Sequence, residues 1–265
     1  MSPLTVGIAG CGKVSRRHIP ALRAAHGVEL VAAFDLDPEA ARSTGVAVAG
    51  SLAELIGRVD LVAVCTPPET HAEVAVEALS AGRDVLVEKP LATTLEDADR
   101  IVAAAAGRLA ATGFQIRCHR KLPPSAEVMH GVWGGPTEAT VGPLLDRAVH
   151  HVDLWRALLG DEVAEASASR HNGGVRLEAL MRGGATPFID LPDDGPPRNV
   201  LVVDERPIDL YAMDGWRDRL RHPLELGRGG PFQSAFAGQW EAVAAGRPPA
   251  TVDDGRRALE IVLGA

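Results

Sequence analysis

One lysine of this chain has a type and a position that suit acid–base or electrostatic chemistry. Lys89 follows the apolar run 85–87 and Glu88, and Pro90 comes directly after it. Ligands in open α/β sheets bind outside the carboxyl ends of the strands, where these residues are expected. The chain otherwise uses arginine almost throughout, and lysine differs from arginine in that it can release or share its proton. Position alone is equally compatible with a solvated lysine after a strand.

An expected helix at 144–159 carries a second candidate group. Asp146, His150 and Asp153 are spaced i, i+4, i+7, so they are expected to share one helix face. Two carboxylates beside an imidazole favour its charged form and raise its pKa, which suits a general acid or base near neutral pH. A charged helix surface is the alternative. His151 diverges from His150 by roughly 100° on a helix, so no metal site is expected.

A glycine-rich turn near the start of the chain is typical of dinucleotide binding. An apolar strand at 4–9 leads into Gly10-x-Gly12-x-x-Ser15, and a helix is expected to about residue 25. Gly10 suits a tight turn, Gly12 allows the backbone to approach a pyrophosphate at the helix N-terminus, and Ser15 replaces the usual third glycine. The loop residues expected to contact the cofactor are Gly10, Cys11, Gly12, Lys13 and Val14.

The acidic residue after the next strand predicts which dinucleotide binds. Asp35 ends a strand at 29–34 and lies twenty residues after Ser15, the spacing expected of a ribose-binding carboxylate. Such a carboxylate repels a 2′-phosphate, and no arginine follows in the next three residues to neutralise one. NAD is therefore expected, with NADP less favoured. A helix cap before Pro38 is the alternative role for Asp35.

Alternation of strands and helices predicts a parallel, doubly wound sheet. Further strands are expected at 46–48, 60–65, 85–87 and 109–112, and helices at 51–56, 70–81 and 94–106. Thr66 and Pro67 follow one of these strands and are expected to line the adenosine side of the cofactor cleft, or simply to form a rigid turn.

The second half of the chain changes to consecutive strands, which predicts an open, mostly antiparallel sheet in an α+β domain. The expected strands are 163–170, 175–181, 186–191, 199–204 and 207–211, and the expected helices are 232–245 and 254–263. The fold class is thus α/β with a second α+β domain. We expect a Rossmann domain at 1–115 and a substrate and oligomerisation domain at 116–265, with the C-terminal helices able to pack back on the first.

Composition limits the partners. The chain has 265 residues, 46% hydrophobic and 23% charged, with a formal net charge of −8, which argues against nucleic acid. No apolar run reaches the roughly 18 residues of a membrane span, and no signal peptide is recognised. Three widely spaced cysteines indicate neither disulfides nor zinc and favour the cytoplasm.

Several motifs together resemble the Gfo/Idh/MocA family of NAD(P)-dependent oxidoreductases. The matching segments, in family order, are 7–18, Cys65-Thr66-Pro67-Pro68-Glu69-Thr70-His71, Val87-Glu88-Lys89-Pro90, Gly113-Phe114-Gln115-x-Arg117 and 146–153. The resemblance implies a cis peptide before Pro90 and assigns the catalytic roles to Lys89, Asp146 and His150. It adds cofactor contacts at Thr66, Pro67, His71, Glu88, Lys89 and Gln115.

The resemblance implies hydride transfer between NAD(H) and a hydroxyl or keto carbon of a small polar substrate, a sugar or cyclic polyol. It also implies a homodimer or higher oligomer formed through the open sheet. Only 31 residues separate Gln115 from Asp146, fewer than family members usually have, and Ala148 replaces a common glycine. A non-catalytic NAD(H)-binding regulator and a redox-neutral enzyme that recycles its bound NAD are therefore alternatives. Arg117, Arg120 and Lys121 are expected either to hold an anionic group of the substrate or to form a solvated turn.

Overall fold

The computed structural model describes residues 2–134, 142–193, 198–212 and 230–265. Contacts divide the chain into two compact units. The first comprises 1–115 and 233–256, and the second comprises 116–232 and 257–265.

The first unit contains a sheet of six parallel strands in the order β3-β2-β1-β4-β5-β6. Their bounds are β1 Leu4–Ala9, β2 Val28–Phe34, β3 Ala47–Val48, β4 Leu61–Val64, β5 Asp84–Val87 and β6 Ala110–Thr112. This is the strand order of doubly wound dinucleotide-binding sheets, and it confirms the predicted fold class. All strands run in the same direction, so the loops that follow β1, β2, β4, β5 and β6 lie at one edge.

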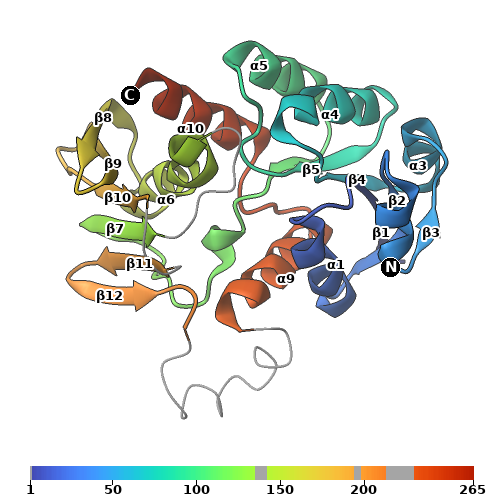
Figure 1. The fold of residues 1–265 in the computed structure, drawn as a ribbon, viewed down its shortest axis with the longest axis horizontal. Coiled ribbons are helices and arrows are strands. Elements are labelled where there is room, and N and C mark those ends of the chain that lie inside the picture. Colours follow the sequence, from blue (N-terminus) through green and yellow to red (C-terminus); the bar gives the residue numbers. More distant parts are fainter. Residues whose placement is uncertain (1, 135–141, 194–197, 213–229) are drawn as a thin grey trace. The chain divides into compact units, whose positions relative to one another are not determined.

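Helices cover both faces of this sheet. Their bounds are α1 Ser15–Ala24, α2 Pro38–Ser43, α3 Leu52–Arg58, α4 His71–Ser80, α5 Leu95–Ala104 and α9 Pro231–Ala244, with a short 3₁₀ turn η1 at Pro68–Thr70. Helices α4 and α5 lie together on one face, and α1 and α9 lie side by side on the other (Figure 1). Ser51 and Thr94 begin α3 and α5 by accepting hydrogen bonds from the backbone amides of Glu54 and Asp97.

The second unit contains a sheet of six strands in the order β12-β11-β7-β10-β9-β8. Their bounds are β7 Met129–Gly134, β8 Val163–His171, β9 Gly174–Met181, β10 Phe188–Pro192, β11 Arg198–Val203 and β12 Arg206–Asp209. The β7–β10 pair is parallel and the other pairs are antiparallel, so the sheet is mostly antiparallel, as predicted.

Strand β7 lies in the middle of this sheet, although the sequence predicted no strand between 115 and 146. Its alternation is hard to recognise because a glycine stands at an inward position. A Cβ atom at Gly131 would lie 3.1 Å from the Leu201 side chain and the Val200 carbonyl oxygen, so a larger residue would force these neighbours to shift slightly. The short segment before Asp146 therefore keeps a central strand.

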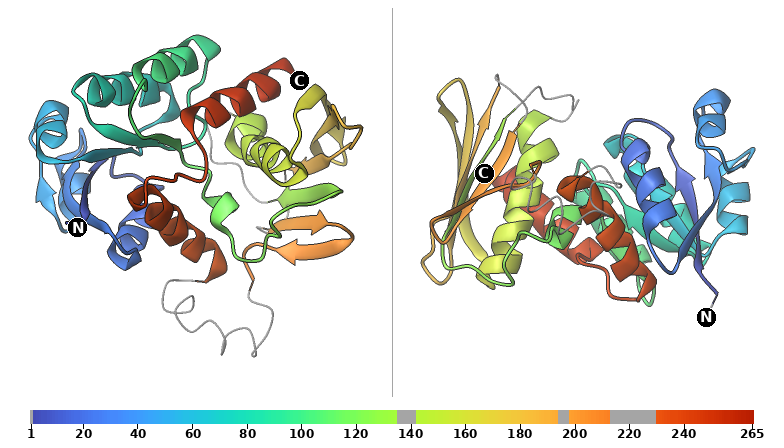
Figure 2. Two further views of the ribbon diagram at one scale, coloured as in Figure 1. Left: turned by 180° about the vertical axis from the view of Figure 1, so that it is seen from behind. Right: turned by 90° about the horizontal axis from the view of Figure 1, so that it is seen from below.

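Helix α6, Val149–Leu159, packs on one face of the second sheet, and the other face carries no described helix (Figure 2). The chain enters α6 through a π-helical turn, Leu144–Ala148, where a single α-helix was predicted. The last helix, α10, spans Val252–Gly264. Among the described residues, no helix is long and apolar enough to cross a membrane. The same residues contain no group of three or more His, Cys, Asp or Glu side chains suited to a metal ion.

Candidate cofactor and active site

The turn after β1 is built around a glycine that no other residue can replace without strain. Gly10 has φ +90°, and a Cβ atom there would lie 2.6 Å from the backbone of Cys65 and Thr66. The left-handed conformation and the close approach of β4 both demand glycine. Gly10 thus holds the ends of β1 and β4 together at the edge where ligands bind in such sheets.

Gly12 differs from Gly10 because the space beside it is open. Among the described residues, no atom lies within 4 Å of a Cβ atom built at Gly12. Helix α1 begins directly afterwards, with no acidic residue in its first turn, so its free backbone amides and dipole favour an anion. The buried Ser15 hydroxyl donates a hydrogen bond to the Gly12 carbonyl at 2.7 Å, which stabilises the conformation of the turn. The arrangement fits a pyrophosphate.

Asp35 stands at the end of β2 and is held by two backbone amides. Its carboxylate accepts hydrogen bonds from the amide of Cys11 at 2.6 Å and from the amide of Asp37 at 2.8 Å. These bonds fix the carboxylate beside the glycine turn and leave lone pairs for ribose hydroxyls. The adjacent Cys11 thiol is buried, and burial, with the charge of Asp35, raises its pKa to about 12. The thiol therefore stays protonated and unreactive.

Thr66, Pro67 and His71 lie beyond β4. His71 is buried, and its Nδ1 and Nε2 atoms each lie 2.9 Å from a carbonyl oxygen, those of Pro90 and Thr66. A neutral imidazole carries one N–H group and donates to one of these carbonyls at a time, so His71 links the loop after β4 to the loop after β5 through one hydrogen bond and one close contact. Burial lowers the pKa of His71, and the two carbonyls oppose that decrease. The contact of His71 with a cofactor stays a prediction, as do those of Thr66 and Pro67.

Glu88, Lys89 and Pro90 follow β5, and the Lys89–Pro90 peptide is cis, which confirms the expectation from the family resemblance. Lys89 is partly exposed between two buried neighbours. The Glu88 carboxylate accepts from the Lys89 amide at 3.1 Å and meets His18 Nε2 at 2.7 Å. Burial would raise the pKa of Glu88, but hydrogen bonding to His18 and the charge of Lys89 hold it below its ordinary value.

Two buried oxygen atoms at this edge have no hydrogen-bond partner within the part of the chain that the structure describes. They are the Thr66 hydroxyl and the Gln115 side-chain carbonyl, which follow β4 and β6. An unpaired buried acceptor costs about 1–3 kcal/mol, so such atoms are expected to meet a ligand or water. Together with the open space at Gly12 and the carboxylate of Asp35, they fit a bound dinucleotide.

In the second unit, Asp153 has a partner that the sequence did not predict. Asp153 is fully buried, and both of its carboxylate oxygens accept hydrogen bonds from the Arg117 guanidinium. Arg117 is therefore neither a free anion-binding group nor part of a solvated turn. Lys121 likewise donates to the Asp209 carbonyl at 3.0 Å. Spacing along one helix could not show a partner from another segment.

Asp146 and His150 lie on the π-helical turn and the first turn of α6. The side chain of Asp146 is 26% exposed, whereas His150 is buried against the Trp133 ring, with the two ring centroids 5.4 Å apart. Arg147 donates to the Trp133 carbonyl at 3.1 Å and joins the π-helical turn to β7. The sequence missed Trp133 because it missed β7. The roles of Asp146 and His150 stay predictions.

Two buried residues of the first unit also escaped the sequence analysis. His18 and Trp240 complete a hydrogen-bonded chain to Glu88, and they are 222 positions apart in sequence. The His18 position lies within a motif that matches the family, but nothing in the sequence indicated its partners.

The strand order, the glycine turn and Asp35 define the class of the first unit: a Rossmann-type dinucleotide-binding fold. Comparison with known proteins agrees. The model of an oxidoreductase family with an NAD-binding Rossmann fold, Gfo/Idh/MocA, matches residues 4–112. The solved structure of GenD2 from gentamicin A biosynthesis, in complex with NAD, shares the fold with a TM-score of 0.79 and 24% identity, covering 100% of this chain and 93% of that one.

Curated relatives extend the match beyond the first unit. Inositol 2-dehydrogenase 2 of Saccharopolyspora erythraea is 34% identical over 84% of this chain and 72% of its own length. The 1,5-anhydro-D-fructose reductase of Ensifer adhaerens is 34% identical over 67% of this chain and 63% of its own. The chain belongs to the Gfo/Idh/MocA oxidoreductase family. It spans less than two thirds of the length of that reductase.

Proposed function

We propose that the chain is an oxidoreductase that transfers a hydride between NAD(H) and a hydroxyl or keto carbon of a sugar or cyclic polyol. The observation that carries the proposal is the open space at Gly12, at the N-terminus of α1 and beside Asp35. Family membership and the names of the relatives, an inositol dehydrogenase and an anhydrofructose reductase, support the substrate class.

The first unit supplies the residues that bind the cofactor. Bound NAD(H) supplies or accepts the hydride. Backbone amides that follow Gly12 bind the pyrophosphate, Asp35 accepts hydrogen bonds from the ribose hydroxyls, and the Gln115 carbonyl accepts from a donor of the bound ligand. Binding would satisfy the buried Gln115 oxygen, for which the described residues offer no partner.

Three side chains act on the substrate in this proposal. Lys89 donates a hydrogen bond to the substrate oxygen and stabilises the negative charge that develops there. His150 moves the proton, and Asp146 orients the imidazole. Of the two carboxylates beside His150 in the sequence, Asp146 is 26% exposed, whereas Asp153 is fully buried and paired with Arg117.

Asp35 favours NAD over NADP. Its carboxylate is fixed by two backbone amides, and the following residues, Leu36 and Asp37, offer no positive charge. A 2′-phosphate placed beside it would meet the negative charge of Asp35, and Leu36 and Asp37 supply no cation to compensate that charge.

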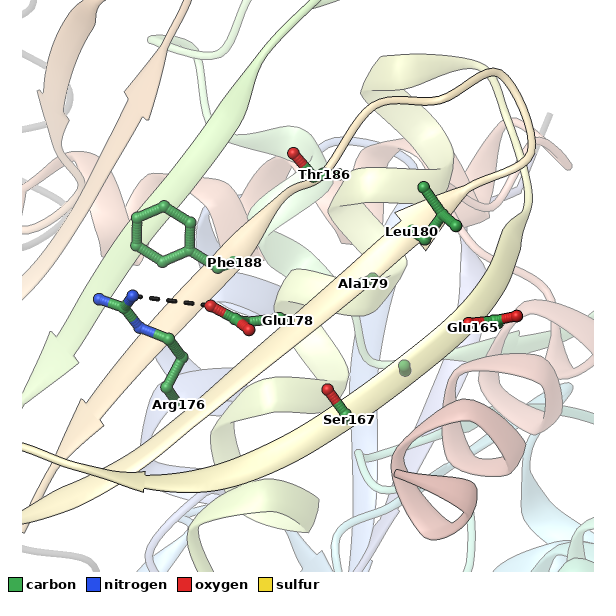
Figure 3. Close-up of a pocket in the computed structure, with 9 residues that line it drawn as sticks. Glu165, Ser167, Arg176, Glu178, Ala179, Leu180, Thr186 and Phe188 are labelled. Atoms are coloured by element: carbon green, nitrogen blue, oxygen red, sulfur yellow. Dashed lines mark ion pairs between the residues drawn. The ribbon is translucent and has the colours of Figure 1, made fainter.

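We also propose a homodimer formed through the face of the second sheet that lies opposite α6, which we call its outer face. This face holds a hollow of about 470 Å³ whose lining mixes charged and apolar side chains, shown in Figure 3. Arg176 lies over the Phe188 ring at 4.4 Å and pairs with Asp190 at 2.6 Å, while Leu180, further along β9 on the same face, is 41% exposed. An extended face that exposes large apolar side chains is typical of an interface.

Two further proposals concern the domain boundaries and the location of the protein in the cell. We propose that residues 1–115 and 116–265 are the dinucleotide-binding and substrate domains, with α9 of the second stretch joining the first unit in its contacts. We also propose a cytoplasmic location. The three free cysteines support it, because thiols stay reduced in that compartment.

Turnover and cofactor binding together test the function. Purified chain is assayed with myo-inositol, 1,5-anhydro-D-fructose and a panel of related polyols, and NADH and NADPH are titrated in parallel. Lys89→Met should lower kcat by about 10²–10³-fold and leave the Kd for NADH within twofold, because the lost charge acts on the substrate oxygen. Lys121→Met, on a lysine bound to backbone carbonyls, is the control.

Turnover that survives in Lys89→Met refutes the catalytic assignment, and tighter binding of NADPH refutes the role of Asp35. NADH binding without turnover of any polyol supports the non-catalytic alternative.

A further inference from the structure

A chain of three buried side chains ends at the backbone of Lys89. The Trp240 indole donates from Nε1 to His18 Nδ1 at 3.1 Å. His18 Nε2 lies 2.7 Å from Glu88 Oε1, and Glu88 Oε2 accepts from the Lys89 amide at 3.1 Å. Trp240 and His18 are fully buried and Glu88 is 4% exposed. The chain connects α9, α1 and the loop after β5 within one unit.

The partners of His18 fix its protonation state. An indole N–H can only donate, so Nδ1 of His18 must be an unprotonated acceptor. The ring proton is then on Nε2 and is donated to Glu88, which accepts it as a carboxylate. Any other tautomer sets two donors or two acceptors against each other in a buried site, which costs about 1–3 kcal/mol. The network therefore has one consistent arrangement.

Packing leaves this network little room to move. The His18 ring meets Phe236 and Trp240 edge to face, with ring centroids 5.1 and 5.6 Å apart. On the far side, Gly113 lies so close that a Cβ atom there would be 2.7 Å from Glu88 Oε1. The Glu88 carboxylate is thus clamped between His18 and the turn after β6, and both of its oxygens are occupied.

We propose that His18 and Trp240 are positioning residues that set the orientation of Lys89 through the Glu88 carboxylate. The inference rests on the proposed role of Lys89. His71 holds the other side of the same tripeptide at the Pro90 carbonyl, so Lys89 projects from a backbone anchored on both sides. A merely structural cluster would contribute stability without affecting Lys89.

Variants with a matched loss of volume separate positioning from stability. Trp240→Phe keeps a six-membered aromatic ring and removes the N–H group together with part of the buried indole, so kcat is expected to fall at least tenfold, with the Kd for NADH within twofold. His18→Gln offers one donor and one acceptor and should retain more activity than His18→Leu, which offers neither. The matched control is Trp155→Phe in α6, since Trp155 is buried in the second unit.

A spectroscopic readout works without turnover. The chain has three lysines, Lys13, Lys89 and Lys121, so reductive ¹³C-methylation gives three side-chain dimethylamine resonances. Lys89→Arg assigns the relevant one. In Trp240→Phe and in Glu88→Gln the Lys89 resonance should shift and broaden, while those of Lys13 and Lys121 stay in place. Long-range ¹H–¹⁵N spectra should show the His18 proton on Nε2.

The outcomes distinguish the two proposals. An unmoved Lys89 resonance in folded Trp240→Phe, or a His18 proton on Nδ1, overturns the positioning role and leaves the proposed function standing. A shifted Lys89 resonance in a chain that turns over no polyol sustains the link from Trp240 to Lys89, and the proposed function alone fails.

Discussion

At the scale of single residues, the second unit contains a histidine with no hydrogen-bond partner. His151 is fully buried, and neither ring nitrogen has a hydrogen-bond partner among the described residues. Its ring meets Trp133 edge to face at 5.7 Å, and the nearby Gly131 leaves it space. Burial lowers the pKa of His151 to about 3, because the protonated ring would lie unpaired in an apolar site.

This lowered pKa predicts that acid destabilises the protein already at pH values higher than those at which carboxylates become protonated. The unfolded chain binds a proton at His151 below its ordinary pKa of 6.5, whereas the folded chain does so only below about 3. The stability that depends on neutral His151 is therefore fully present above pH 6.5 and is lost as the pH falls towards 3. From pH 8 to pH 5 the loss is about 2 kcal/mol in the free energy of unfolding.

Urea unfolding of wild type and His151→Leu at pH 8, 6.5 and 5 measures this loss. The variant should show a shallower pH dependence, with the remainder due in part to His71, whose pKa is also lowered. His26→Gln is the control, because the His26 side chain is 90% exposed. Equal pH dependence in wild type and His151→Leu would contradict the assignment.

At the scale of elements, the two glycines of the turn between β1 and α1 have different tasks. Gly10 meets the backbone of β4 in a left-handed conformation, whereas the space beside Gly12 is open. Gly10→Ala should therefore lower stability by at least about 2 kcal/mol, since strain and a backbone clash add. Gly12→Ala should leave the unfolding midpoint unchanged and weaken NADH binding at least tenfold, because its methyl group occupies the cofactor's approach.

Thermal unfolding and NADH titration of the two variants check this contrast. A Gly12→Ala protein that binds NADH as tightly as wild type would show that the open space is not the pyrophosphate site.

The elements that the sequence predicted correctly are those that local pattern determines. Short apolar runs ending in polar turns indicated the parallel strands, and the spacing from Ser15 placed Asp35 at the end of β2. Features that depend on distant partners were missed. The bond from Arg117 to Asp153 spans 36 positions and that from Trp240 to His18 spans 222. Periodicity within one helix carries no information about such partners.

At the scale of the molecule, the open sheet of the second unit is the surface through which we propose that two copies of the chain associate. Its outer face places Leu180 directly beside Glu165 across the β8–β9 pair, with Glu178 on the same face. A second copy that covered this face would remove the Leu180 side chain from water. The charged side chains around it would then form the rim of the interface.

Leu180→Glu tests the dimer. A third carboxylate beside Glu165 and Glu178 would be buried without a partner in the interface, so the dimer Kd should rise at least a hundredfold, about 2.7 kcal/mol. Sedimentation velocity at micromolar concentration should give the mass of two chains for wild type and of one for the variant. Leu36→Glu, at a leucine 91% exposed in the first unit, should remain a dimer. A monomeric wild type would refute the interface, and a dimeric Leu180→Glu would place it on another face.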